Sequence, residues 1–305
     1  MLAYAVKRLL LALLVAIAVS VLSFMLLRIS GDVATAIAGE SATSADIEQV
    51  REMYGLNRPL IVQYGDWALG ALRGDFGESF YFKTPVTSVI RTHIAVTVIL
   101  GACGLGFALV LSIPLGVLAA LRPNTWLDRL ALTISVLGQA LPTFWFALMM
   151  IIFFGVMLRW LPITGSSTWK HFVMPSVALG YYATPAIMRL TRTGMLDVMS
   201  SDYIRTARAK GLRTGAVLFK HALRNAIIPV VSLSAVQLGF MLGGSVVIET
   251  IFALHGLGFL AWESITRSDV AVVQAIVLIL ACFYIVLTLL ADLLNAYLDP
   301  RIRVA

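Results

Sequence analysis

Six long runs of residues that contain no Lys, Arg, Asp or Glu dominate the pattern of apolar and polar positions along the chain. Each run holds 17 to 29 residues, and a helix needs roughly 17–25 to cross about 30 Å of hydrocarbon. Because a helix satisfies its own backbone hydrogen bonds, the pattern predicts an all-α polytopic membrane protein with six transmembrane helices. The runs cover residues 9–27, 94–121, 130–158, 172–188, 225–248 and 270–291.

Helix breakers and small residues interrupt several runs. Gly138 and Pro142 lie in the third run, and Gly243 and Gly244 lie in the fifth. One interpretation is close helix packing through small faces, and the other is a translocation path or gate whose helices bend and slide. Glu249 follows the fifth run directly, and it is either a capping residue or a carboxylate that faces the gate or the substrate.

The composition excludes most soluble functions. Of 305 residues 60% are hydrophobic and 13% are charged, with a mean hydropathy of +0.92. The net charge of +7 does not predict nucleic-acid binding, because the basic residues flank apolar runs instead of forming a stripe with aromatics. No metal-ligand cluster and no ionisable residue lies within the runs, so ion-coupled transport and intramembrane proteolysis lack their usual groups.

The basic residues predict an orientation with both termini in the cytoplasm. With the N-terminus inside, 14 of the 23 Lys and Arg residues lie on the cytoplasmic side, eight of them between Arg189 and Arg224. A cleaved signal peptide is the alternative for the first run, because Ala34-Thr35-Ala36 resembles a cleavage site. We expect this helix to be retained, since its 19 apolar residues exceed the roughly 7–15 of a signal peptide.

The segment between the first two runs predicts a small external helical module. Thr43 with Asp46 is typical of a helix start, and Pro59 opens a second helix that ends near Arg73. This module either has a role of its own or only packs over the mouth of the bundle. We therefore divide the chain into a first helix (1–30), an external module (31–93) and a core of five helices (94–305).

Within that core, residues 191–228 form a basic cytoplasmic segment too charged to span the membrane. Ser200-Ser201-Asp202 predicts the start of a short helix that Gly211 ends. Because Ala207 and Ala209 stand between basic residues, this helix is expected to have little to bury against its own chain. It either anchors on anionic lipid or docks into a groove on a partner protein.

Several motifs in this order resemble one family. The segment 202–211 (DYIRTARAKG), followed by His221 and Pro229, resembles the cytoplasmic "EAA" loop of binding-protein-dependent ABC importer permeases. The B-type subunits of the dipeptide/oligopeptide/nickel family are the most similar. Residues 55–60 (GLNRPL), 74–79 (GDFGES), 249–252 (ETIF), 256–258 (GLG) and 299–303 (DPRIR) are similar to further motifs of that family. Arg205, Thr206, Arg224 and His255 depart from the commonest residues of the pattern.

The resemblance implies a type I ABC importer permease in the bacterial inner membrane, and not an enzyme. Its partners would be a homologous second permease, two cytoplasmic ATP-binding subunits, an external substrate-binding protein and membrane lipid. The permease would bind no cofactor directly, with ATP and magnesium on the partner subunits, and the chain indeed has no GxxxxGK[ST] phosphate loop. The residues implied to couple to the ATPase are Tyr203, Arg205, Thr206, Ala207, Arg208, Ala209, Lys210, Gly211, Leu212 and His221.

The cargo implied by the resemblance is a dipeptide or oligopeptide. Nickel chelates, glutathione-like peptides and opine or sugar conjugates stay open as alternatives. An ion-coupled secondary transporter and a membrane scaffold without transport activity are the remaining classes.

Overall fold

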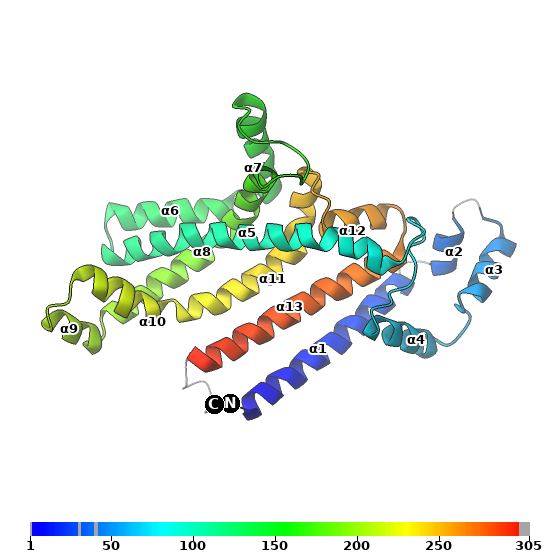
Figure 1. Ribbon diagram of the computed structural model, residues 1–305, viewed down its shortest axis with the longest axis horizontal. Coiled ribbons are helices and arrows are strands. Elements are labelled where there is room, and N and C mark those ends of the chain that lie inside the picture. Colours follow the sequence, from blue (N-terminus) through cyan, green and yellow to red (C-terminus); the bar gives the residue numbers. More distant parts are fainter. Residues whose placement is uncertain (1, 30–31, 40–41, 299–305) are drawn as a thin grey trace.

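The computed structural model describes residues 2–29, 32–39 and 42–298, and these are almost entirely helical (Figure 1). The motif at 299–303, with Arg301 and Arg303, lies outside the described residues. The helices are α1 (Leu2–Ile29), α2 (Val33–Ala38), α3 (Ser44–Met53), α4 (Leu60–Leu72), α5 (Val86–Leu121), α6 (Trp126–Ala140), α7 (Thr143–Met150), η1 (Ile151–Met157), α8 (Lys170–Met199), α9 (Asp202–Ala209), η2 (Ala216–Leu223), α10 (Arg224–Ala226), α11 (Ile228–Ile251), α12 (Leu257–Thr266) and α13 (Val270–Leu298).

Five long helices, α1, α5, α8, α11 and α13, form an elongated bundle (Figure 1). The start of α1, the end of α13 and the short helix α9 lie toward one end of the bundle. The helices α2, α3, α4 and α12 lie toward the opposite end.

Four described helices are long and apolar enough to cross a membrane: α1 over Ala5–Met25, then α5, α11 and α13. The pair formed by α6 and α7–η1 would be a fifth span if it crosses as one broken element. Helix α8 contains the fourth apolar run and is 30 residues long, but it does not meet the same test. The structure therefore supports four or five of the six predicted spans.

The third apolar run is not one helix, which corrects the expectation of a single continuous helix over 130–158. Helix α6 ends at Ala140, α7 begins at Thr143, and the two axes differ by 101°. Pro142 is the N-cap of α7, and Leu141 before it is extended, as a residue that precedes proline prefers to be. Pro142 marks the position of this break in the sequence, but the absence of charge along the run gives no information on the change of direction.

The core depends on close contact between α5 and α8. A Cβ atom placed on Gly180 of α8 would lie 2.2 Å from the carbonyl oxygen of Gly104 in α5. The two backbones therefore touch, as small residues allow in membrane bundles. The Ser112 hydroxyl, further along α5, donates to the carbonyl of Thr184 over 3.0 Å. Packing through small residues thus explains Gly104 and Gly180 without a role in transport.

The external module begins its helices as the sequence predicts. Thr43 and Asp46 form a reciprocal capping box at the start of α3, and Pro59 precedes α4, which ends at Leu72. On α4, Tyr64 packs edge-on against Phe24 of α1, with ring centroids 5.4 Å apart. The module is therefore attached to the first helix of the bundle.

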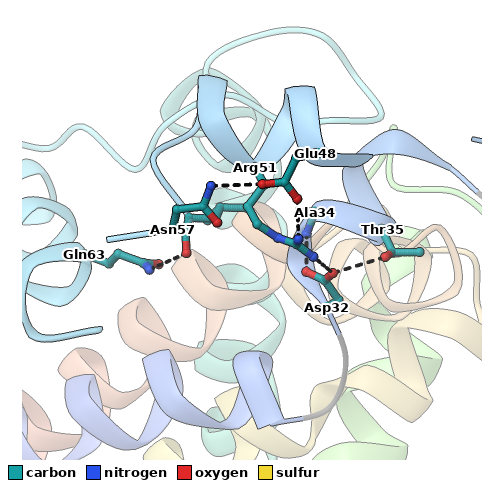
Figure 2. A network of polar contacts seen from close by, with 8 residues as sticks. Asp32, Ala34, Thr35, Glu48, Arg51, Asn57 and Gln63 are labelled. Atoms are coloured by element: carbon teal, nitrogen blue, oxygen red, sulfur yellow. Dashed lines mark hydrogen bonds and ion pairs between the residues drawn. The ribbon is translucent and has the colours of Figure 1, made fainter. Parts of the chain in front are cut away.

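A network of polar contacts ties the module together (Figure 2). Arg51 of α3 forms ion pairs with Glu48 and with Asp32, each at 2.6 Å. Asp32 also accepts from the backbone N–H of Ala34, so it caps α2. Burial opposes the charged form of Asp32, but the hydrogen bonds from Ala34 and Arg51 outweigh it and lower the pKa of this carboxyl. Asn57 extends the network by donating to Glu48.

We expect Gly180→Ala to destabilise the protein by about 1–3 kcal/mol or more, because the added methyl group must push α5 and α8 apart. Gly106→Ala is the matched control, since a Cβ atom there meets nothing within 4 Å. Thermal unfolding of the two purified variants, followed by size-exclusion chromatography, measures the difference. Equal unfolding temperatures would contradict the backbone contact.

Candidate functional site

A cavity of about 570 Å³ opens between α6, α7, α8 and α11, beside the break at Pro142. Its walls combine apolar side chains with four uncharged polar ones. The lining residues are Gln139, Thr143, Leu179, Tyr182, Ala183, Gln237, Phe240, Met241 and Gly244. Because α6 ends at Ala140 and the chain then turns away, α7 leaves this space open instead of filling it.

The polar side chains of the cavity have no hydrogen-bond partner among the described residues. These side chains belong to Gln139, Thr143, Tyr182 and Gln237. Gln237 lies near the middle of the 24-residue α11, and Tyr182 lies near the middle of the 30-residue α8. A carboxamide at this depth has no water to bond to unless it faces an aqueous space. The cavity is therefore an open hollow on the bundle that can hold water or a polar molecule.

The glycines and the proline predicted for a path divide between packing and the cavity. Gly244 lines the cavity, and Gly243 beside it is exposed with open space around it. Gly138 is buried, and a Cβ atom there would lie 2.4 Å from the carbonyl oxygen of Tyr181. Gly138 thus allows α6 to approach α8, while Pro142 produces the break that borders the cavity. Sequence reasoning missed the two glutamines, although a carboxamide within a long apolar run is itself a detectable signal.

Glu249 lies in the interior, at 0% exposure, and joins α11 to α5 and α12. Its Oε1 accepts from the hydroxyls of Thr97 at 2.7 Å and Ser245 at 2.8 Å, and its Oε2 accepts from the N–H of Phe259 at 2.9 Å. Thr97 in turn accepts from the N–H of Leu257 at 2.7 Å.

These contacts satisfy backbone donors at the start of α12. The N-cap of this helix is Gly256, which has no side chain to accept from the first N–H groups. Glu249 and Thr97 take over that role from neighbouring helices. In this conformation Glu249 therefore acts as a capping residue, and it does not line the cavity.

Helix α9 has the predicted boundaries, with Ser201 as its N-cap and Gly211 in a left-handed conformation (φ +73°) after its end. Ser201 does not cap through its side chain, because its hydroxyl donates back to the carbonyl of Val198. The boundary is thus predicted correctly, but the capping interaction is not.

The expectation that α9 has little to bury against its own chain is wrong. Ile204 is fully buried and Ala207 is 7% exposed. The two side chains pack into a cluster with Met195 of α8 and with residues of α5, η2 and α10. Local patterns do not show this, because the cluster brings α9 together with Val117 and Ala120 of the distant helix α5 as well as with the neighbouring segments. Its buried residues are Val117, Ala120, Met195, Ile204, Ala207, Val217, Ala222 and Ala226.

The other residues implied to couple to the ATPase form the outer face of this segment. Arg205 has a side chain 75% exposed and pairs with Asp202 at 2.7 Å. His221 is half-buried on η2, and Asn225 donates to the hydroxyl of Tyr203, which ties α9 to α10. The exposed residues are Tyr203, Arg205, Thr206, Arg208, Ala209, Lys210, Gly211 and Leu212.

A bidentate ion pair joins α6 to α8, the helix that precedes α9. Arg192 of α8 donates to both oxygens of Asp128 in α6, at 2.8 and 2.7 Å, and Asp128 is 3% exposed. The N–H of Asn124 also donates to Asp128 at 2.9 Å. Removing one partner of such a buried pair leaves an uncompensated charge, which is strongly destabilising. The pair therefore fixes α6 and the preceding turn to α8, the helix that leads into α9.

Family models and relatives match the chain over nearly its whole length. The model "Binding-protein-dependent transport system inner membrane component" matches residues 112–304, and the corresponding N-terminal model matches residues 1–101. The glutathione transport system permease proteins GsiC of Pectobacterium atrosepticum and of Escherichia coli K12 are each 40% identical over 304 residues. These alignments cover 99% of this chain and 99% of each relative.

Solved structures of the methionine ABC transporter MetNI in inward-facing conformations share the fold. Two crystal forms align with 69% and 71% of this chain and with 96% and 95% of their own chains. The TM-scores are 0.57 and 0.51, at 20% and 21% sequence identity. At that identity the similarity shows the ABC permease fold alone.

We expect Glu249→Leu to destabilise the protein by about 3–5 kcal/mol, because it leaves several buried donors unpaired. Glu249→Gln should lose only about 1–2 kcal/mol, since a carboxamide can accept from Phe259 and donate to the two hydroxyls. Thermal unfolding and transport per folded protein measure both effects, with the partly exposed Glu263→Gln as control. If Glu249→Gln folds normally but abolishes transport, its charge acts at a gate and the capping role is insufficient.

Proposed function

The chain belongs to the family of binding-protein-dependent transport system inner membrane components, and from that premise we propose that it imports peptide-like solutes together with a homologous second permease. It is a multi-pass permease subunit of an ABC importer in the inner membrane, without a nucleotide-binding domain of its own. By its family it works with ATPase subunits and a substrate-binding protein. The cargo and the second permease are the new elements of this proposal.

The proposed topology has six spans, with both termini on the cytoplasmic side. Four or five spans meet a length and composition test, and α8 is long enough to be the sixth. The start of α1, the end of α13 and the basic helix α9 lie toward the same end of the bundle, which supports this orientation (Figure 1).

Coupling to two ATPase subunits is proposed to pass through the outer face of α9. Small and basic residues, such as Ala209 and Arg208, are exposed there and suit a groove with acidic edges on a partner. The inner face of α9 is packed against α5 and α8. A displacement of α9 by the ATPase would therefore move these helices with it. ATP on the partner subunits can bias the bundle only by favouring one of its two packings.

The proposed cargo is a dipeptide or oligopeptide, including glutathione-like peptides. The observation that carries it is the 40% identity over 99% of the chain to permeases named for glutathione transport. Nickel chelates and opine or sugar conjugates are the alternatives within the same importer architecture. An ion-coupled secondary transporter would instead lose uptake when the ion gradient collapses, and a scaffold would show no uptake at all.

The test of cargo is uptake by the importer assembled with its own ATPases and binding protein in proteoliposomes. ATP-dependent uptake of labelled glutathione or a tripeptide, unaffected by ionophores, is the expected result. Uptake that follows an ion gradient in the absence of ATP would contradict the proposal.

We expect Ala209→Trp to reduce ATP-driven uptake by about tenfold or more, because a large side chain would obstruct docking of the exposed face. The permease itself should stay folded, since Ala209 does not belong to the buried cluster. Ala45→Trp, at an exposed position on α3, is the matched control.

Ala207→Trp should act differently, by forcing α9 away from its own chain and exposing the segment to limited proteolysis. For both Ala209→Trp and Ala207→Trp, limited proteolysis reports whether α9 stays packed, and co-purification reports whether the ATPase still binds. Normal uptake and ATPase binding by Ala209→Trp would remove this face from the coupling surface.

A further inference from the structure

We propose that Gln139 and Gln237 form an amide-binding station that holds the main chain of the cargo peptide inside the membrane. This inference rests on the proposed peptide cargo and assigns a specificity role to side chains of the permease. The two carboxamides come from different helices, α6 and α11, and line one cavity. Thr143 and Tyr182 add a hydroxyl each to the same walls.

The first argument is the lack of partners. Among the described residues, the structure gives no hydrogen bond to the side chains of the two glutamines, of which Gln139 is exposed and Gln237 is half-buried, whereas both oxygens of the buried Glu249 carboxylate are paired. An unpaired carboxamide in an apolar bundle costs free energy unless it meets water or a polar ligand. Such unpaired groups are consistent with a ligand that arrives and leaves.

The second argument is chemical complementarity. A carboxamide has a donor and an acceptor, as does each peptide unit, so it can bond to any peptide main chain independently of sequence. The lining contains no Lys, Arg, Asp or Glu, so the cavity cannot select for charged side chains. Tyr182 and Phe240 are 52% and 62% exposed and provide aromatic faces for apolar side chains.

The third argument is shape, because the size of the cavity suits a small ligand. The cavity of about 570 Å³ lies within the range of small-molecule sites, roughly 300–1,000 Å³. Gly244 keeps one wall free of a side chain, with nothing near its Cβ position.

The test uses the whole importer in proteoliposomes with saturating loaded binding protein. Uptake of labelled tri-alanine is compared with uptake of tri-alanine methylated at one peptide nitrogen, which lacks one N–H donor. The ratio of the two rates is measured for the unaltered importer, for Gln237→Leu and for Gln139→Leu. Because the binding protein is the same throughout, its own preference cancels between permease variants.

We expect the preference for the unmethylated peptide to fall about fivefold in Gln237→Leu, because this is the effect of losing one neutral hydrogen bond. Gln139→Leu should show the same direction, and Gln49→Leu on the exposed face of α3 should leave the ratio unchanged. Size-exclusion chromatography checks that each complex is assembled.

An unchanged ratio in assembled Gln237→Leu and Gln139→Leu importers would overturn the amide-binding station. These variants could also lose the second permease while the complexes that remain keep an unchanged ratio. That result would assign the glutamines to the subunit contact and would likewise overturn the amide-binding station. If the unaltered importer takes up neither probe, the proposed peptide cargo itself fails. The two failures are therefore distinguishable.

Discussion

The interior of a lipid bilayer offers no hydrogen-bond partners, and this constraint explains where the polar residues of the chain lie. Glu249, Thr97 and Ser245 satisfy one another and the first N–H groups of α12. Ser112 reaches across to the backbone of α8. Gln139 and Gln237 have no partner among the described residues and line one cavity, whereas Ser176, Ser264 and the side-chain nitrogen of Gln274 are buried without a partner elsewhere. The contrast separates polar groups that hold helices together from polar groups that are available to a passing molecule.

The same bundle connects the helices around the cavity to α9. Contact between Gly180 and the backbone at Gly104 holds α8 against α5, and the Asp128–Arg192 pair holds α6 against α8. Helix α9 packs its inner face onto this assembly. A force on the outer face of α9 would therefore act on the helices that border the cavity. In this account the inner face of α9 transmits motion and the outer face receives it.

Local signals in the sequence predicted local structure well. The capping box of Thr43 and the proline before α4 determine helix starts within a few residues, so the external module could be predicted. The membrane helices follow from apolar length in the same way. The inward orientation of Ala207 depends partly on Val117 and Ala120 of α5, which no local pattern pairs with α9. Pro142 marks a break in the third apolar run, but the residue alone does not give its 101° angle. The cavity could not be predicted for the same reason, since three separate helices and the start of α7 create it.

The measurement that tests the central claim most directly is solvent access at the cavity. Single cysteines are introduced as Gln237→Cys and, for a lipid-facing comparison, Val110→Cys, after Cys103 and Cys282 have been replaced by serine. Val110 is 76% exposed on the surface of α5, so it serves as an outward-facing apolar position. The account predicts that a membrane-impermeant thiol reagent modifies Gln237→Cys in the assembled importer, that a loaded binding protein with ATP changes the rate, and that Val110→Cys stays unmodified. Equal reactivity at the two positions, or protection of Gln237→Cys in every state, would contradict it.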